Sequence, residues 1–357
     1  MNRRDLLAGL IAATLPVTAL LAQDVNLPTL DLLLPDWEAW KLAYLTPDGR
    51  VVDVLQKGAS HSESQGYGLF LAATFADAEA FNRIYGWSEM NLAIRPDALL
   101  AWRWLPDPTN AVTDTNNASD GDLFYAWGLI TMAAKGGDAA LKARATAIAS
   151  DLAAKCIVAH PDGSGRVLFT PAAAGFDRGG AIIINFSYYM PLAMRELAKA
   201  TGVELLATCA KDGEAMMDEL ASIGLMPDWI EVGPLGATSV AEMSDHSGYE
   251  ALRIGLFLAW SGNAAHPAVQ RQVNAYRATA VSSGTTATEF DRLSGAVISS
   301  SPNPGYAAIA ALMDCAVEKA PGAALPAFST QQPYYPGTLH LMTLIAQISI
   351  YPRCFPL

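Results

Sequence analysis

The stretch SHSESQGYGLFLAAT, residues 60–74, decides the fold class of this chain. It begins with polar residues and continues into an apolar segment. Side chains of that segment recur at the 3.6-residue period of an α-helix: Tyr67, Phe70, Leu71 and Thr74. Glu63 stands in the first turn of the expected helix, where a negative charge is favoured by the helix dipole. Gly66 and Gly68 lack the third glycine and the preceding strand of a dinucleotide site, so they predict close backbone packing instead.

The same helical period returns further along the chain, in residues 123–130 and 249–260. Asp77 precedes another apolar run, and residues 119–122 precede Leu123, as N-capping residues would. Strand signals are limited to residues 166–170 and 181–186. The sequence therefore predicts a mainly helical fold with a small β ribbon near residues 165–186.

Composition narrows the class of protein. The chain has 357 residues, 52% of them hydrophobic and 16% charged, which is too apolar for a disordered protein. A net charge of −12 argues against a nucleic-acid partner, whereas an acidic, aromatic-rich protein suits a neutral carbohydrate. At about 28 residues per helix and loop, the length has room for roughly a dozen helices. No linker or low-complexity tract divides the chain, so we expect residues 23–357 to form one catalytic domain.

The N-terminus predicts export. Arg3 and Arg4 precede an uncharged stretch from Leu6 to Ala22, the layout of a signal peptide and, with its paired arginines, of the twin-arginine type. We expect residues 1–22 to be this export signal and the protein to be periplasmic or secreted. An uncleaved membrane anchor is the alternative, although the stretch is short for a full span.

The sequence contains no motif typical of a cofactor site or a metal site. No phosphate-binding loop and no G-x-S-x-G motif is present, so we expect no cofactor. The cysteines are far apart and the histidines are scattered, so we expect no metal site. For Cys156, Cys209, Cys315 and Cys354 we expect buried free thiols rather than disulfides.

Carboxylates at helix starts are the strongest functional signal. Glu63, Asp120 and Glu250 each have a local explanation, as a first-turn acid, an N-cap beside Asp122, and a helix ion pair with Arg253. If the three helices met at one face, these acids would converge. A protonated carboxyl and a second carboxylate that activates water are what glycoside hydrolysis requires.

At these residues the chain resembles glycoside hydrolase family eight, and within it the exported endoglucanases that accompany bacterial cellulose synthase. The resemblance spans nearly the whole mature chain and is carried by residues 49–53, 60–68, 87, 91–92, 102–104, 114–122, 185–189, 227–229 and 249–253. It implies an (α/α)6 barrel and an inverting endo-β-1,4-glucanase. It also implies cellulose or another β-1,4-glucan as substrate and the cellulose synthase machinery as a further partner.

The resemblance also implies roles for individual residues. Glu63 corresponds to the general acid, which must carry a proton near neutrality. Asp120 corresponds to the acid that orients the sugar and the water, and Tyr188 to the tyrosine that positions the water. Glu250 stands at the general base, with Arg253 beside it. Three tryptophans are expected to stack on glucose faces: Trp102, Trp104 and Trp229.

Two residues depart from the family pattern. Glu250 stands where the family usually has Asp, and its extra methylene moves the carboxylate by roughly a bond length. Such a shift matters, because a positioning error of ~1 Å can lower the catalytic rate about a hundredfold. Asp245, five residues earlier, is the reserve candidate for the base. Ser64 stands where the family usually has Gly after the acid.

Two alternatives remain open at this point. One is the same fold acting on another β-glycan, such as xylan, mixed-linkage glucan or chitosan. The other is a weakly or non-catalytic glucan-binding component of cellulose secretion, which the Glu250 departure motivates.

Overall fold

The computed structural model describes residues 28–319, 322–323 and 325–355, and these residues are mostly helical. The predicted export signal, residues 1–22, lies outside them. Eleven α-helices occur within the described residues: α1 (Leu34–Tyr44), α2 (Ser62–Thr74), α3 (Ala78–Asn91), α4 (Ser119–Gly136), α5 (Ala139–Lys155), α6 (Pro191–Thr201), α7 (Leu205–Ile223), α8 (Leu252–Trp260), α9 (Pro267–Ala278), α10 (Pro304–Glu318) and α11 (Tyr334–Ile350). None of the helices in these ranges combines the length and the apolar character needed to cross a membrane.

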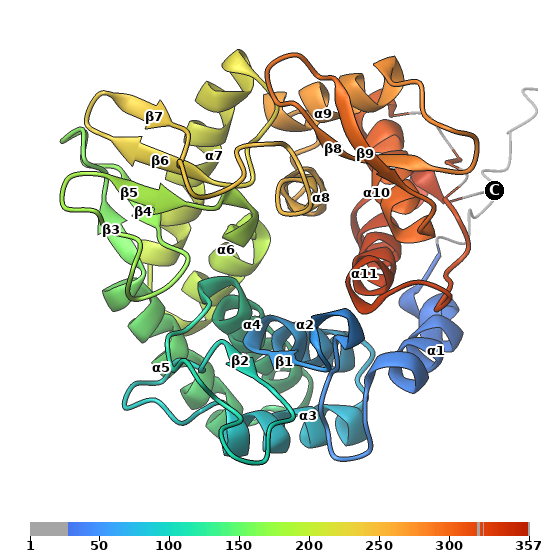
Figure 1. Ribbon diagram of the computed structural model, residues 1–357. Helices are drawn as coiled ribbons and strands as arrows, with labels where there is room; N and C mark the ends of the chain where they lie inside the picture. The colour runs from blue at the N-terminus through green and yellow to red at the C-terminus, as the bar shows by residue number, and fades with distance from the viewer. Residues whose placement is uncertain (1–27, 320–321, 324, 356–357) are drawn as a thin grey trace, which may run out of the picture.

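The helices follow one another around a ring (Figure 1). Helices α2, α4, α6, α8 and α11 lie toward its middle, while α3, α5, α7 and α9 lie toward its outside. Successive inner helices α2, α4, α6 and α8 contact one another, and α8 contacts α11. Every residue of α8 is buried, whereas α3 and α9 bury only one face. Helices that are apolar on all sides therefore occupy the interior, and amphipathic ones cover them.

Small antiparallel sheets connect the helices. They pair β1 (Ser60–His61) with β2 (Arg103–Trp104), β3 (Ile157–Ala159) with β4 (Val167–Phe169), β6 (Ile230–Gly233) with both β5 (Ile182–Ile184) and β7 (Gly236–Thr238), and β8 (Thr286–Phe290) with β9 (Val297–Ser301). The expected ribbon near residues 165–186 is therefore wrong in its pairing. Both strands form, but β4 and β5 belong to different sheets because each finds a partner elsewhere in the chain.

Glycines bring the α2 and α4 backbones together. A Cβ atom added to Gly66 would lie 2.7 Å from the carbonyl oxygen of Gly121, and one added to Gly121 would lie 2.5 Å from the backbone nitrogen of Glu63. Neither distance is possible for a real side chain. This confirms the packing role predicted for Gly66, and it places Glu63 of α2 beside Asp120 of α4.

One predicted cap is confirmed and one is wrong. The Asp77 side chain accepts a hydrogen bond from the Ala80 N–H at the start of α3. Helix α4, however, begins at Ser119 rather than at Leu123. Asp120 and Asp122 thus lie inside its first turn rather than at the N-cap, which is Ala118. Their carboxylates accept from Arg253 Nη1 and from the Leu100 N–H, respectively.

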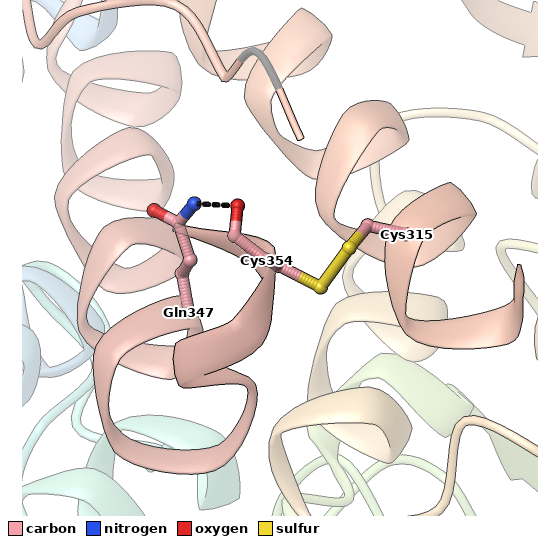
Figure 2. The surroundings of a disulfide bond; sticks show 3 residues. All are labelled: Cys315, Gln347 and Cys354. Carbon is pink, nitrogen blue, oxygen red and sulfur yellow. Dashed lines mark hydrogen bonds between the residues drawn. A yellow bond between two sulfur atoms is a disulfide. The ribbon is translucent and has the colours of Figure 1, made fainter. Parts of the chain in front are cut away.

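Near the C-terminus, the prediction that all four cysteines are free thiols is wrong for two of them. Cys315 of α10 and Cys354 of the 3-10 helix η4 (Pro352–Cys354) form a disulfide, and Gln347 Nε2 donates to the Cys354 carbonyl over 2.8 Å (Figure 2). The chain turns back after α11, which brings Cys354 onto α10 across a sequence separation of 39 residues. Cys156 and Cys209, in the described part of the chain, are buried free thiols as expected.

Candidate active site

The start of α2 positions Glu63 through hydrogen bonds within four residues. His61 is the N-cap residue of α2, and its side chain accepts from the Ser64 N–H. The Ser64 hydroxyl in turn accepts from the His61 N–H over 3.0 Å. This is a reciprocal capping box, with His61 in place of the usual Ser or Thr. Ser64, the departure from the family pattern, therefore has a structural use beside the candidate acid.

The start of α4 positions Asp120. Ser119 anchors this turn, because its hydroxyl donates to the Thr170 carbonyl over 2.7 Å. The Asp120 side chain is buried, and its Oδ1 accepts from the Gly121 N–H over 2.8 Å. Its Oδ2 lies 3.3 Å from Nη1 of Arg253.

Glu250 lies in the turn immediately before α8. Its Oε2 atom accepts from Asn185 Nδ2 over 3.1 Å and from Ser187 Oγ over 3.0 Å. The same oxygen pairs with Nη2 of Arg253, the partner that the helix spacing predicted. Ser187 Oγ is also 2.8 Å from Arg253 Nη2, so the carboxylate is held on several sides.

Arg253 joins these acids into one group, which we call the Arg253 cluster: Arg253, Glu63, Asp120 and Glu250. Glu63 Oε2 lies 2.6 Å from Nη1 of Arg253, the nitrogen that also faces Asp120, while Glu250 binds Nη2. The predicted convergence of the three acids is therefore present. The side chains of Arg253 and Asp120 are 1% and 2% exposed, whereas those of Glu63 and Glu250 are 20% and 34% exposed. Glu63 and Glu250 are thus the acids that can reach a substrate.

Burial and charge set the ionisation of the cluster. Burial disfavours the charged guanidinium, but the surrounding phenols and carboxylates outweigh it and hold the pKa of Arg253 well above its usual range. Burial, and then the neighbouring Glu63 carboxylate, raise the pKa of Asp120 well above its usual range against the pull of Arg253. Asp120 can therefore keep a proton that an exposed aspartate would lose.

Glu63 and Glu250 line one cavity of about 420 Å³. Tyr249 and Tyr335 line it as well, and the Tyr335 hydroxyl donates to the Tyr249 carbonyl over 2.6 Å. Asp53, in the segment before α2, also lines this cavity. Two partly exposed carboxylates facing one cavity, with a permanent cation between them, can deliver a proton to a bound ligand and accept another from water.

Tyr188 and Trp229 belong to one aromatic group beside the cluster. The Tyr188 ring lies 5.8 Å from the Arg253 guanidinium carbon and 6.1 Å from the Trp229 ring. Burial, followed by the charges of Asp120 and Glu250, raises the pKa of Tyr188 well above its usual range, so its hydroxyl stays a donor. Phe176 stacks on Trp229 with an interplanar angle of 8°.

Trp102 directly precedes strand β2 and Trp104 lies in it, and β2 pairs with β1 just before α2. The Arg103 guanidinium sits 4.2 Å from the Trp102 ring centre, and Trp102 Nε1 donates to Asp114 over 2.9 Å. Arg50 lies 4.6 Å from the Trp104 ring centre. Both indoles are half-buried, so part of each ring remains accessible.

Several residues of the site carried no predicted role. Asn185 and Ser187 belong to the 185–189 motif, of which only Tyr188 had been given a function. The Tyr67 hydroxyl accepts a further hydrogen bond from Arg253 Nη1 over 2.9 Å. Asp245, the reserve base, accepts from Ser239 Oγ over 2.6 Å, which leaves it bound outside the Arg253 cluster. No group of three or more His, Cys, Asp or Glu suited to a metal ion occurs in those residues either.

Comparisons with known proteins agree on one family. The model of "Glycosyl hydrolases family 8" matches residues 11–349. A protein named "Probable endoglucanase" from Novacetimonas hansenii is 30% identical over 328 residues, covering 90% of this chain and 92% of that protein. An endoglucanase from Cellulomonas uda is 29% identical over 255 residues, covering 69% and 70%. The structure of the endo-beta-1,4-glucanase CMCax from Acetobacter xylinum has a TM-score of 0.78 at 27% identity, covering 89% of this chain and 98% of that one.

Proposed function

The chain belongs to glycosyl hydrolases family 8, and from that premise we propose that it is an inverting endo-β-1,4-glucanase of cellulose-type chains. The observation that carries the proposal is the pair of carboxylates, Glu63 and Glu250, that bind one guanidinium and line one cavity. The names of its relatives, which are endoglucanases, support the substrate class.

The proposed reaction follows from this pair. The protonated carboxyl of Glu63 donates its proton to the glycosidic oxygen as the bond from that oxygen to the anomeric carbon breaks. A water molecule attacks the anomeric carbon from the opposite face, and the Glu250 carboxylate accepts the proton that this water loses. Arg253 holds both carboxylates in place, and Asp120 and Tyr188 orient sugar and water beside it.

The ring of inner and outer helices supports the (α/α)6 barrel as the finer description of the fold. In such a barrel, Trp102, Trp104 and Trp229 would offer faces to successive glucose rings. One face of Trp102 is occupied by Arg103, which leaves the other for a sugar.

We propose in addition that the enzyme works outside the cytoplasm, in the periplasm or after secretion, and serves cellulose synthesis. The paired arginines near the N-terminus support export. The Cys315–Cys354 disulfide also supports it, since such bonds persist in oxidising compartments.

Hydrolysis of carboxymethylcellulose, followed by NMR of the newly formed reducing ends, tests the reaction directly. We expect products with the anomeric configuration opposite to that of the β-linked substrate. Retained configuration would overturn the inverting mechanism. A parallel panel of xylan, mixed-linkage glucan and chitosan tests the substrate. If any of these is hydrolysed faster than carboxymethylcellulose, that glycan replaces cellulose as the proposed substrate.

A further inference from the structure

The turn that carries Glu250 depends on a distant residue. Helix α8 begins at Leu252, and its N-cap residue is Ala251. Alanine has no side-chain acceptor, so Ala251 cannot satisfy the N–H groups at the start of the helix. Such groups need an acceptor when they are buried. The acceptor here comes from residue 228, before strand β6.

Asp228 accepts three backbone N–H groups of this turn on one carboxylate oxygen. Its Oδ1 lies 3.0 Å from the Gly248 nitrogen, 3.1 Å from the Glu250 nitrogen and 2.8 Å from the Ala251 nitrogen. Its Oδ2 accepts from Ser244 Oγ over 3.2 Å. The side chain is buried, with 7% of the residue exposed.

The backbone around Asp228 is bound to the same loop. The Asp228 N–H donates to the His246 carbonyl over 2.7 Å, and the Trp229 N–H donates to the Ser244 carbonyl over 3.1 Å. The fit is close at Gly248, where an added Cβ atom would lie 2.6 Å from Asp228 Oδ2. The turn therefore has one position relative to residue 228.

We propose that Asp228 is the positioning residue of the general base, fixing the backbone from which the Glu250 side chain extends. The proposal rests on the proposed function of Glu250. Asn185, Ser187 and Arg253 hold the carboxylate of Glu250, while Asp228 holds its main chain. A glutamate has one more rotatable bond than the usual aspartate, so both ends must be held for its carboxylate to meet the water in one place.

The test compares Asp228→Ala with Asp228→Asn. We expect Asp228→Ala to lower kcat on carboxymethylcellulose by about a hundredfold with little change in KM, since the base is displaced but the sugar contacts remain. Asp228→Asn keeps an oxygen acceptor for the three N–H groups and should restore most of the lost kcat. An equal loss in both variants would overturn the proposal, as would a folded Asp228→Ala variant with wild-type kcat.

Asp212→Ala is the matched control. Asp212 Oδ2 also accepts a long-range backbone bond, from the Val167 N–H over 2.9 Å, but on α7 and strand β4. Its kcat should stay at the wild-type value. If Asp212→Ala lost as much kcat as Asp228→Ala, the effect would be one of general stability and the proposal would fail.

Two further variants separate this proposal from the function it rests on. If Asp228 acts through Glu250, the double variant Asp228→Ala with Glu250→Ala should be no slower than Glu250→Ala alone; an additional loss would contradict the proposal. If Asp228→Ala does not fold, Gly248→Ala replaces it in the test, because the added Cβ atom pushes the turn away from Asp228. We expect the same fall in kcat, and a folded Gly248→Ala variant with wild-type kcat would overturn the proposal. Full activity of Glu63→Gln, by contrast, would refute the proposed function without bearing on what holds the turn.

Discussion

The starts of helices α2 and α8 hold the two candidate catalytic carboxylates in opposite ways. Glu63 sits inside a capping box made by His61 and Ser64, so its backbone is fixed by neighbours in sequence. Glu250 sits in a turn fixed by Asp228, and its carboxylate by Asn185 and Ser187. Both carboxylates bind Arg253, but the backbone of the proposed acid is held by local structure, whereas the backbone of the proposed base is held by a distant segment.

This difference has a consequence for how the site tolerates change. A substitution near α2 alters one hydrogen-bonded turn, and the α2–α4 backbone contact still places Glu63. A substitution in either of two distant segments, residues 185–187 or residue 228, can displace Glu250. The following predictions probe that asymmetry.

Glu63→Gln should have the largest effect, lowering kcat by about a thousandfold or more, because amide nitrogen cannot supply the proton for the leaving oxygen. Release of reducing ends from carboxymethylcellulose measures the loss. Affinity for the glucan, measured by calorimetry on the inactive variant, should remain near that of the wild type. Turnover at the wild-type rate would remove Glu63 from its role.

Glu250→Asp should lower kcat by roughly ten- to a hundredfold, although it restores the residue usual in the family. The shorter side chain draws the carboxylate away from Asn185 and Ser187, which are spaced for glutamate. The comparison with Glu250→Ala is decisive. A strong gain in Glu250→Asp, together with no loss in Glu250→Ala, would favour a weakly catalytic glucan-binding protein instead.

Asp122 gives a pH-dependent contribution to stability from within α4. Burial raises its pKa from 3.8 to about 7, despite hydrogen bonds from the Leu100 N–H and from Asn117. The folded chain therefore binds this proton more tightly than the unfolded chain does. The stabilisation is fully present below pH 3.8 and is lost as pH rises toward about 7.

Asp122→Asn should remove this part of the pH dependence. Thermal unfolding between pH 5 and 8 (roughly the window set by the raised pKa) should show a smaller decline in Tm for the variant than for the wild type. Parallel Tm curves for the two proteins would show that Asp122 does not titrate in that window.

Ser64→Gly should have the smallest effect and completes the comparison of the two helix starts. It removes one arm of the capping box and should cost about 1 kcal/mol of stability, seen in urea unfolding. Because the α2–α4 contact remains, kcat should change less than about threefold, well below the loss expected for Asp228→Ala. A fall as large as that of Asp228→Ala would mean that both carboxylates depend equally on their turns.

The sequence predicted what local patterns determine. The period of Tyr67, Phe70 and Leu71 predicted α2, and Asp77 predicted the start of α3. The convergence of Glu63, Asp120 and Glu250 followed from their places at helix starts together with the family resemblance, and the geometry of the Arg253 cluster agrees with it.

What the sequence did not predict depends on contacts between distant segments. The pairing of β5 with β6, the early start of α4 and the Cys315–Cys354 bond each need a partner far along the chain. The hydrogen bonds of Asp228 belong to the same class. No spacing or period links residue 228 to residue 250, and their contact arises only when the helices assemble.

The glycine contact between α2 and α4 separates chemistry from recognition. Because Gly66 and Gly121 meet through main-chain atoms, the spacing of Glu63 and Asp120 does not depend on the identity of the side chains around them. The tryptophans proposed to meet the polysaccharide, Trp102, Trp104 and Trp229, lie outside this contact. Substitutions at these tryptophans, made to change the glycan preference, are therefore expected to leave the spacing of the proposed acid Glu63 and Asp120 unchanged.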